Sequence, residues 1–133
     1  MSQAAKDKRV KAVVCWAPAV FFRPLWAKKW TNAILKKGFT SNVWGFKFTK
    51  KLLETDFKYD NNLKEARKIK VPVQIIHGTK DAAVPLSQSK ELYKNLNCEK
   101  ELIALKGANH IFSGEGELEK AISSTKEFFG KHI

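Results

Sequence analysis

Residues 71–85 read VPVQIIHGTKDAAVP, and this segment carries the strongest structural signal in the sequence. Its β-branched residues, with Pro72 at the start and Gly78 at the end, predict a strand that is buried on both faces. Asp81 follows in the loop beyond the strand's carboxyl end, and Val84-Pro85 ends that loop. Because open parallel sheets carry their reactive groups at the carboxyl ends of the strands, Asp81 is a candidate site residue.

The same design repeats further along the chain. A helix capped by Ser87 and running to about Leu96 is expected to pack on the sheet. Residues 101–105, ELIAL, read as the next strand, and GANHIF at 107–112 forms a second loop at a strand's carboxyl end, with His110 inside it. A helix from about Leu118 to His132 follows, with apolar residues at i, i+3, i+4 spacing.

The HGTKDAAVP string, the GANHIF loop and the last amphipathic helix together resemble the C-terminal part of α/β-hydrolases of the esterase, lipase or acyl-peptidase kind. The resemblance covers about residues 69–133. It implies a partial α/β-hydrolase fold, three-layered, with a short and mostly parallel sheet of three core strands. It also implies that Asp81 and His110 are two members of a Ser-His-Asp triad, in which the acid orients the imidazole and the imidazole takes the nucleophile's proton.

The third member of that triad has no counterpart here. The family's nucleophile lies in a G-x-S-x-G elbow upstream of the acid, and no such string occurs in the 133 residues. None of the serines has the flanking glycines: Ser2, Ser41, Ser87, Ser89, Ser113, Ser123 and Ser124. The resemblance therefore implies a C-terminal portion that lacks the half with the nucleophile and oxyanion donors, and that is inactive alone.

An earlier strand is predicted from Val10 to Trp16, ended by Pro18. In the resembled family this strand pairs with the nucleophile strand, so its outer edge is expected to be unpaired. An apolar edge without proline or inward charge invites pairing with another chain. We expect a homodimer or higher oligomer through this strand or through the aromatic segment from Phe21 to Phe48, or binding to a polypeptide that supplies the missing half.

Residues 19–66 are predicted to form a lid-like insertion within a single α/β-hydrolase-like domain, residues 1–133. Aromatic residues between positions 21 and 30 follow helical spacing, a β-ribbon is expected around Gly45, and a helix from about Thr49 to Phe57. Since such an insertion covers the pocket in the resembled family, Trp26, Trp30 and Trp44 are candidates for substrate binding. Ordinary packing of these aromatic residues is an equal alternative.

The charge balance, 25 basic against 13 acidic residues, gives a net charge of +12. Lysines are spread along the whole chain and only Arg23 and Arg67 follow Arg9, so the pattern favours a solvated lysine-rich surface over a nucleic-acid site. No signal-peptide core and no run of about 18 apolar residues is present, which favours a cytoplasmic protein without a membrane span.

The sequence contains no motif for binding a cofactor or a metal. Three scattered histidines give no ligand spacing, so neither a metal nor another cofactor is expected. The two cysteines, Cys15 and Cys98, form neither a disulfide framework nor a metal motif and are expected to be free thiols.

Each candidate also has a structural interpretation. Asp81 suits a turn cap, His110 a solvent-facing loop, and His77 a structural position at the strand end. Two functions follow for the chain. One is a serine esterase or acyl hydrolase to which the chain contributes the acid and the base; the other is a non-catalytic α/β binding module with a basic, aromatic surface.

Overall fold

The computed structural model describes residues 3–21, 32, 34, 36–41, 47–51 and 63–133. The elements in chain order are β1 (Val13–Trp16), β2 (Phe39–Ser41), β3 (Lys47–Thr49), α3 (Leu63–Ala66), β4 (Val73–Gly78), α4 (Leu86–Asn95), β5 (Lys100–Leu105) and α5 (Glu117–His132). They belong to two compact units, Met1–Val20 with Asn62–Ile133, and Phe21–Asn61. None of the helices in the described ranges is long and apolar enough to cross a membrane.

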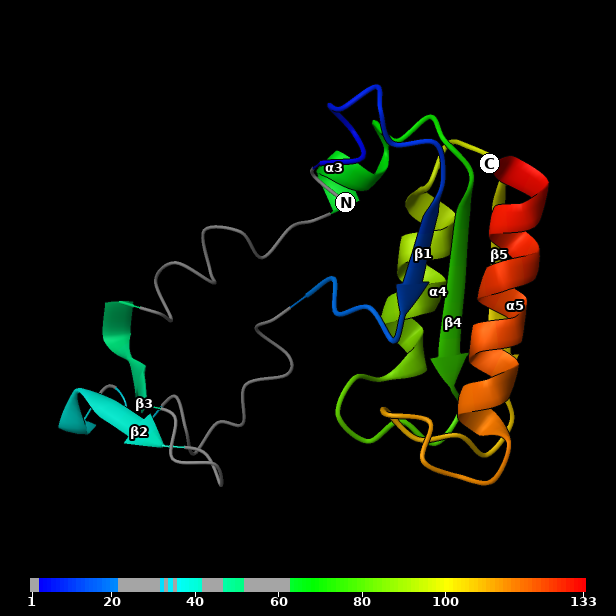
Figure 1. The fold of residues 1–133 in the computed structure, drawn as a ribbon. Coiled ribbons are helices and arrows are strands. Elements are labelled where there is room, and N and C mark those ends of the chain that lie inside the picture. The colour runs from blue at the N-terminus through cyan, green and yellow to red at the C-terminus, as the bar shows by residue number, and fades with distance from the viewer. Residues whose placement is uncertain (1–2, 22–31, 33, 35, 42–46, 52–62) are drawn as a thin grey trace. The chain divides into compact units, whose positions relative to one another are not determined.

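A parallel sheet forms the centre of the first unit, with its strands in the order β1-β4-β5 (Figure 1). Val73 of β4 is level with Val13 of β1 on one side and with Lys100 of β5 on the other. Because all three strands run the same way, their carboxyl ends meet at one edge of the sheet. The predicted short sheet of three parallel core strands is confirmed.

Helices cover both faces of this sheet. Every residue of β4 is buried, as predicted for a strand with no solvent-facing side. On one face His77 lies 2.6 Å from the Ser89 hydroxyl of α4, and on the other the Gln74 amide donates to the Ser124 carbonyl of α5. Since side chains three positions apart in a strand point to opposite faces, α4 and α5 are on opposite sides, and the unit is three-layered.

Three features differ from the sequence-based expectation, two of them element boundaries. β1 begins at Val13, not Val10, because the Val10 N–H bonds back to the Asp7 carbonyl in a turn. Helix α4 begins at Leu86 with Pro85 in the capping position, so Ser87 lies in the first turn and caps nothing. The predicted apolar face of α5 is only partly buried.

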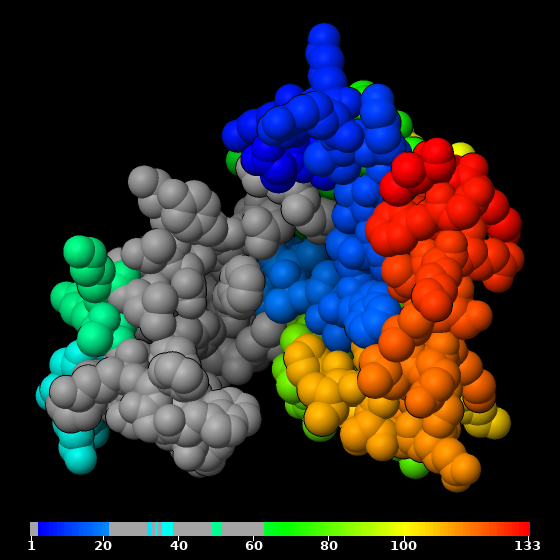
Figure 2. Space-filling view, in the orientation of Figure 1, coloured from blue at the N-terminus to red at the C-terminus, as the bar shows by residue number. Residues whose placement is uncertain are grey.

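Within α5, Ala121 and Phe128 are buried, whereas Leu118 and Ile122 stay 41% and 39% exposed. Ala121 joins a core cluster with Ile76, Ala108 and Phe112. In the space-filling view this helix, orange to red, runs beside the blue N-terminal residues that include β1 (Figure 2). The helix is therefore anchored by a narrow stripe of its surface.

The second unit contains the predicted β-ribbon. β2 and β3 pair antiparallel, with Phe39 opposite Thr49 and Ser41 opposite Lys47. Its turn around Gly45, the predicted helical residues between 22 and 31 and most of the helix predicted from Thr49 lie outside the described residues. Its role as a lid stays a prediction.

Candidate active site

Two neighbouring strand ends bring the candidate residues together. The loop after β4 carries Asp81 and the loop after β5 carries His110. Backbone and side-chain hydrogen bonds join the two loops: Thr79 N–H to Leu105 O at 3.0 Å, Lys80 N–H to Ala108 O at 2.9 Å, and Gly107 N–H to Thr79 Oγ1 at 2.8 Å. The loops that carry Asp81 and His110 are thus joined by hydrogen bonds.

Gly78 allows the two loops to approach this closely. A Cβ at this position would overlap the carbonyl oxygen of Ala108 and lie 2.6 Å from its carbon and 2.7 Å from the Asn109 carbonyl oxygen. All three atoms belong to backbone and cannot rotate away. A glycine at the end of β4 is therefore a requirement of the His110 loop.

Asp81 and His110 form a hydrogen-bonded pair. His110 Nδ1 lies 2.8 Å from Asp81 Oδ2. The Asp81 side chain is fully buried, while that of His110 is 43% exposed. With a carboxylate on Nδ1, that nitrogen carries the ring proton, which leaves Nε2 as the basic nitrogen. This is the orientation that a triad histidine requires.

Hydrogen bonds keep the Asp81 carboxyl ionised. Burial alone would raise its pKa, yet the pKa is lowered, because the backbone N–H of Val84, the His110 ring and the backbone N–H of Ala83 all stabilise the charge. Oδ1 accepts from Val84 N–H at 2.7 Å and from Ala83 N–H at 2.9 Å. The turn-cap role expected as an alternative is thus present as well, on the oxygen that His110 does not use.

The His110 loop is shaped by its own polar residues. Asn109 Oδ1 accepts from the N–H groups of Ile111 and Ser113, at 3.1 and 3.2 Å, and its amide donates to Ser113 Oγ at 2.6 Å. This closes a turn directly around the histidine. The Asn109 side chain therefore fixes the backbone that follows His110.

The end of β1 supports the same loop. Phe112, buried with a positive φ of 54°, contacts Trp16 edge to face, with 5.7 Å between ring centroids. Trp16 in turn donates its indole N–H to Thr125 Oγ1 of α5 at 3.0 Å. Trp16 thus connects the histidine loop to α5.

A second histidine, His77, contacts Asp81, and this contact was not predicted from the sequence. Its ring is fully buried at the end of β4, and its Nε2 lies 3.1 Å from Asp81 Oδ2. The spacing HG-x-x-D was the available signal, because a buried histidine four residues before a loop carboxylate needs polar partners. The sequence assigned it only a structural position.

The other candidate groups are less informative. The predicted substrate-binding residues Trp26, Trp30 and Trp44 lie outside the described residues. Cys15 and Cys98 are free thiols, as predicted, and burial raises the pKa of both, which disfavours the reactive thiolate. In the described ranges, no three His, Cys, Asp or Glu side chains gather as a metal site would require.

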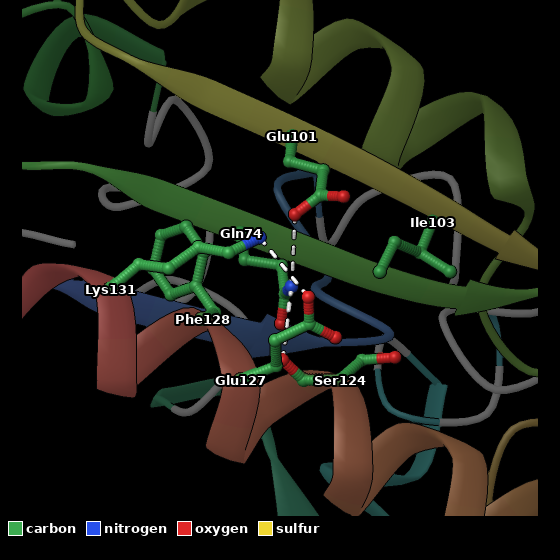
Figure 3. Close-up of a pocket in the computed structure, with 7 residues that line it drawn as sticks. All are labelled: Gln74, Glu101, Ile103, Ser124, Glu127, Phe128 and Lys131. Carbon is green, nitrogen blue, oxygen red and sulfur yellow. Dashed lines mark hydrogen bonds and ion pairs between the residues drawn. The ribbon is translucent and has the colours of Figure 1, made fainter.

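A small cavity of about 50 Å³ lies elsewhere, between the sheet and α5 (Figure 3). Its lining residues are Gln74, Glu101, Ile103, Ser124, Glu127, Phe128 and Lys131. The Gln74 amide nitrogen bonds Glu101 and the Ser124 carbonyl, while its buried Oε1 has no partner among the described residues. The space suits ordered water and is formed by residues other than those of the Asp81–His110 pair.

Solved structures of the α/β-hydrolase kind share this fold. Est1E from Butyrivibrio proteoclasticus, solved with ferulic acid, matches at a TM-score of 0.83 and 22% identity, over 98% of this chain and 53% of its own. Mouse α/β-hydrolase domain-containing protein 10 matches at 0.77 and 18% identity, over 98% and 56%. The monoacylglycerol lipase of Paleococcus ferrophilus matches at 0.71 and 22% identity, over 92% and 60%.

The chain thus spans between half and two thirds of the length of these structures, and the likeness establishes a partial α/β-hydrolase fold. No curated protein matches the sequence. The model of one protein family, described as serine aminopeptidase, S33, matches residues 40–117, a span that contains both Asp81 and His110. As that span is more than half of the 133 residues, the chain belongs to the serine aminopeptidase S33 family of hydrolases.

Proposed function

We propose that this chain supplies the acid, Asp81, and the base, His110, of a Ser-His-Asp triad that hydrolyses carboxylic esters. The serine comes from a polypeptide segment outside these 133 residues, because no G-x-S-x-G string occurs within them. The observation that carries the proposal is the 2.8 Å contact between His110 Nδ1 and a fully buried Asp81 carboxylate. The chain alone is therefore inactive.

The pair has the chemistry of a general base. Asp81 fixes the tautomer in which His110 Nε2 is unprotonated, and the half-exposed ring can meet a serine hydroxyl. Nε2 then removes the hydroxyl proton as the oxygen attacks the ester carbonyl, and returns it to the leaving alkoxide. Asp81 stabilises the imidazolium that forms between these steps.

The solved structures that share this fold favour esters as the substrate class. The monoacylglycerol lipase is named for an ester substrate and shares the fold over 92% of this chain, and Est1E was solved with ferulic acid, a carboxylic acid. The family description names an aminopeptidase, which uses the same acyl-transfer chemistry on an amide. An ester is the easier test substrate because its leaving group needs less protonation.

The test combines the chain with a polypeptide that carries the strand, the G-x-S-x-G elbow and the following helix, and follows hydrolysis of a short p-nitrophenyl ester. We expect turnover by the mixture and none above free imidazole by the chain alone. Asp81→Asn should reduce kcat by about 10³–10⁴-fold, since the wrong tautomer is then held. Ser123→Ala, on the exposed side of α5, is the matched control and should leave the rate unchanged.

Labelling with a fluorophosphonate tests whether this chain carries an activated serine of its own. The chain alone should take up no label, because no activated serine is present. Saturable hydrolysis by the chain alone, lost on substitution of one of its own serines, would contradict the proposal. So would a mixture whose activity survives His110→Gln.

A further inference from the structure

Two histidines contact Asp81, the proposed triad acid. Asp81 Oδ2 lies 2.8 Å from His110 Nδ1 and 3.1 Å from His77 Nε2, so one carboxylate oxygen faces two imidazole rings. The two rings differ in exposure: His77 is fully buried and His110 is 43% exposed. His77 therefore cannot take part in proton exchange with a substrate, and its contact with Asp81 needs another explanation.

The surroundings of His77 fix where its proton is. Nε2 faces two acceptors, the Val84 carbonyl oxygen at 2.8 Å and Asp81 Oδ2 at 3.1 Å. An unprotonated Nε2 would place its lone pair against both oxygens, which is repulsive in a buried setting. Nδ1 lies 2.6 Å from Ser89 Oγ, a hydroxyl that is able to donate to it. The ring thus carries its proton on Nε2 and accepts from Ser89 on Nδ1.

Val84 forms hydrogen bonds with both Asp81 and His77. Its N–H donates to Asp81 Oδ1 at 2.7 Å, and its carbonyl accepts from His77 Nε2. The Asp81 carboxylate is consequently held at both oxygens, by backbone on one and by His77 on the other. Rotation of the carboxylate away from His110 would give up a buried N–H of His77 and a buried N–H of Val84 together.

We propose that His77 is a positioning residue for the triad acid: its Nε2–H faces Asp81 Oδ2 and keeps that oxygen directed at His110. The proposal rests on the function proposed above for Asp81 and His110. His77 touches neither substrate nor nucleophile and acts only through Asp81. Ser89 sets the ring tautomer from the other side.

Two substitutions separate this role from simple packing. The Gln side chain places its amide nitrogen near the position of His Nε2, whereas the shorter Asn side chain reaches only the position of Nδ1, the Ser89 side. His77→Gln thus keeps a donor toward Asp81, and His77→Asn loses it while it stays polar. A merely structural role predicts equal effects on the site.

The readout is the downfield proton resonance of the hydrogen-bonded His110 Nδ1–H, assigned by its loss in Asp81→Asn. We expect the resonance to be retained in His77→Gln and lost or strongly broadened in His77→Asn. An unchanged resonance in His77→Asn would overturn the proposal. Because this signal needs no nucleophile, it stands even where reconstituted hydrolysis fails, so the two proposals fail separately.

A measurement on the unmodified chain tests the proposal even if the variants do not fold. In ¹⁵N-histidine spectra the two ring nitrogens of His77 report which one is protonated. We expect a protonated Nε2 and an acceptor Nδ1. A ring with its single proton on Nδ1 would overturn the proposal, since no N–H would then face Asp81.

Discussion

Gly78→Ala tests how tightly the acid and base loops are joined. The new methyl group would overlap the Ala108 carbonyl and press on the Asn109 carbonyl at 2.7 Å, so the His110 loop must move away from β4. Overpacking of this kind costs about 1–3 kcal/mol. The hydrogen bond from Lys80 N–H to Ala108 O, 2.9 Å long, is lost in that movement and adds about 1 kcal/mol.

The expected total is a loss of about 2–4 kcal/mol in the free energy of unfolding. Urea denaturation measures it, and with an m-value of about 2 kcal/mol/M the midpoint should fall by about 1–2 M. Gly130→Ala is the matched control, because a Cβ added there meets nothing within 4 Å inside α5. It should stabilise by roughly 0.5–1 kcal/mol, as Gly in a helix is unfavourable relative to Ala.

The same variant reports on the site. Movement of the His110 loop should weaken the Asp81–His110 hydrogen bond, and with it the downfield resonance of His110 Nδ1–H. A Gly78→Ala protein within 0.5 kcal/mol of the unmodified chain, roughly the size of a surface substitution, and with that resonance intact, would refute the reasoning. It would mean that the two loops can move apart without loss of stability, despite their close backbone contacts.

Two further predictions concern acid and association. The folded-state pKa of Asp81 lies below its ordinary value of 3.8, so the unfolded chain takes up the proton first on acidification. Its contribution to stability should be complete above about pH 5 and be lost as pH falls through the folded-state pKa, and urea midpoints of Asp81→Asn against pH should lack this component. We also propose self-association through β1, which pairs only with β4 among the described strands and whose Trp16 is 38% exposed. Light scattering should report a dimer or larger species at micromolar concentration; a monomer with exchange-protected β1 amides would contradict it.

Local signals in the sequence were enough to predict several elements of the fold. Burial on both faces of β4 follows from its β-branched run, and the loops with Asp81 and His110 follow from glycines that end two strands. The resemblance then paired these two residues. In the structure the His110 ring and the Asp81 carboxylate lie at hydrogen-bond distance. These features needed no knowledge of distant contacts.

The spatial neighbours of those residues, in contrast, became known only from the folded protein. Pro85 in place of Ser87 at the start of α4 depends on where the Asp81 turn ends, and Leu118 on α5 is exposed although the helical spacing predicts burial. His77 shows the reason most clearly. Its residue type fits a packed strand end equally well. The proposed role depends on Val84 in the Asp81 loop and on Ser89, which reaches His77 only when α4 folds back onto the sheet. Hydrogen bonds of this kind depend on three-dimensional proximity, which a one-dimensional pattern does not encode.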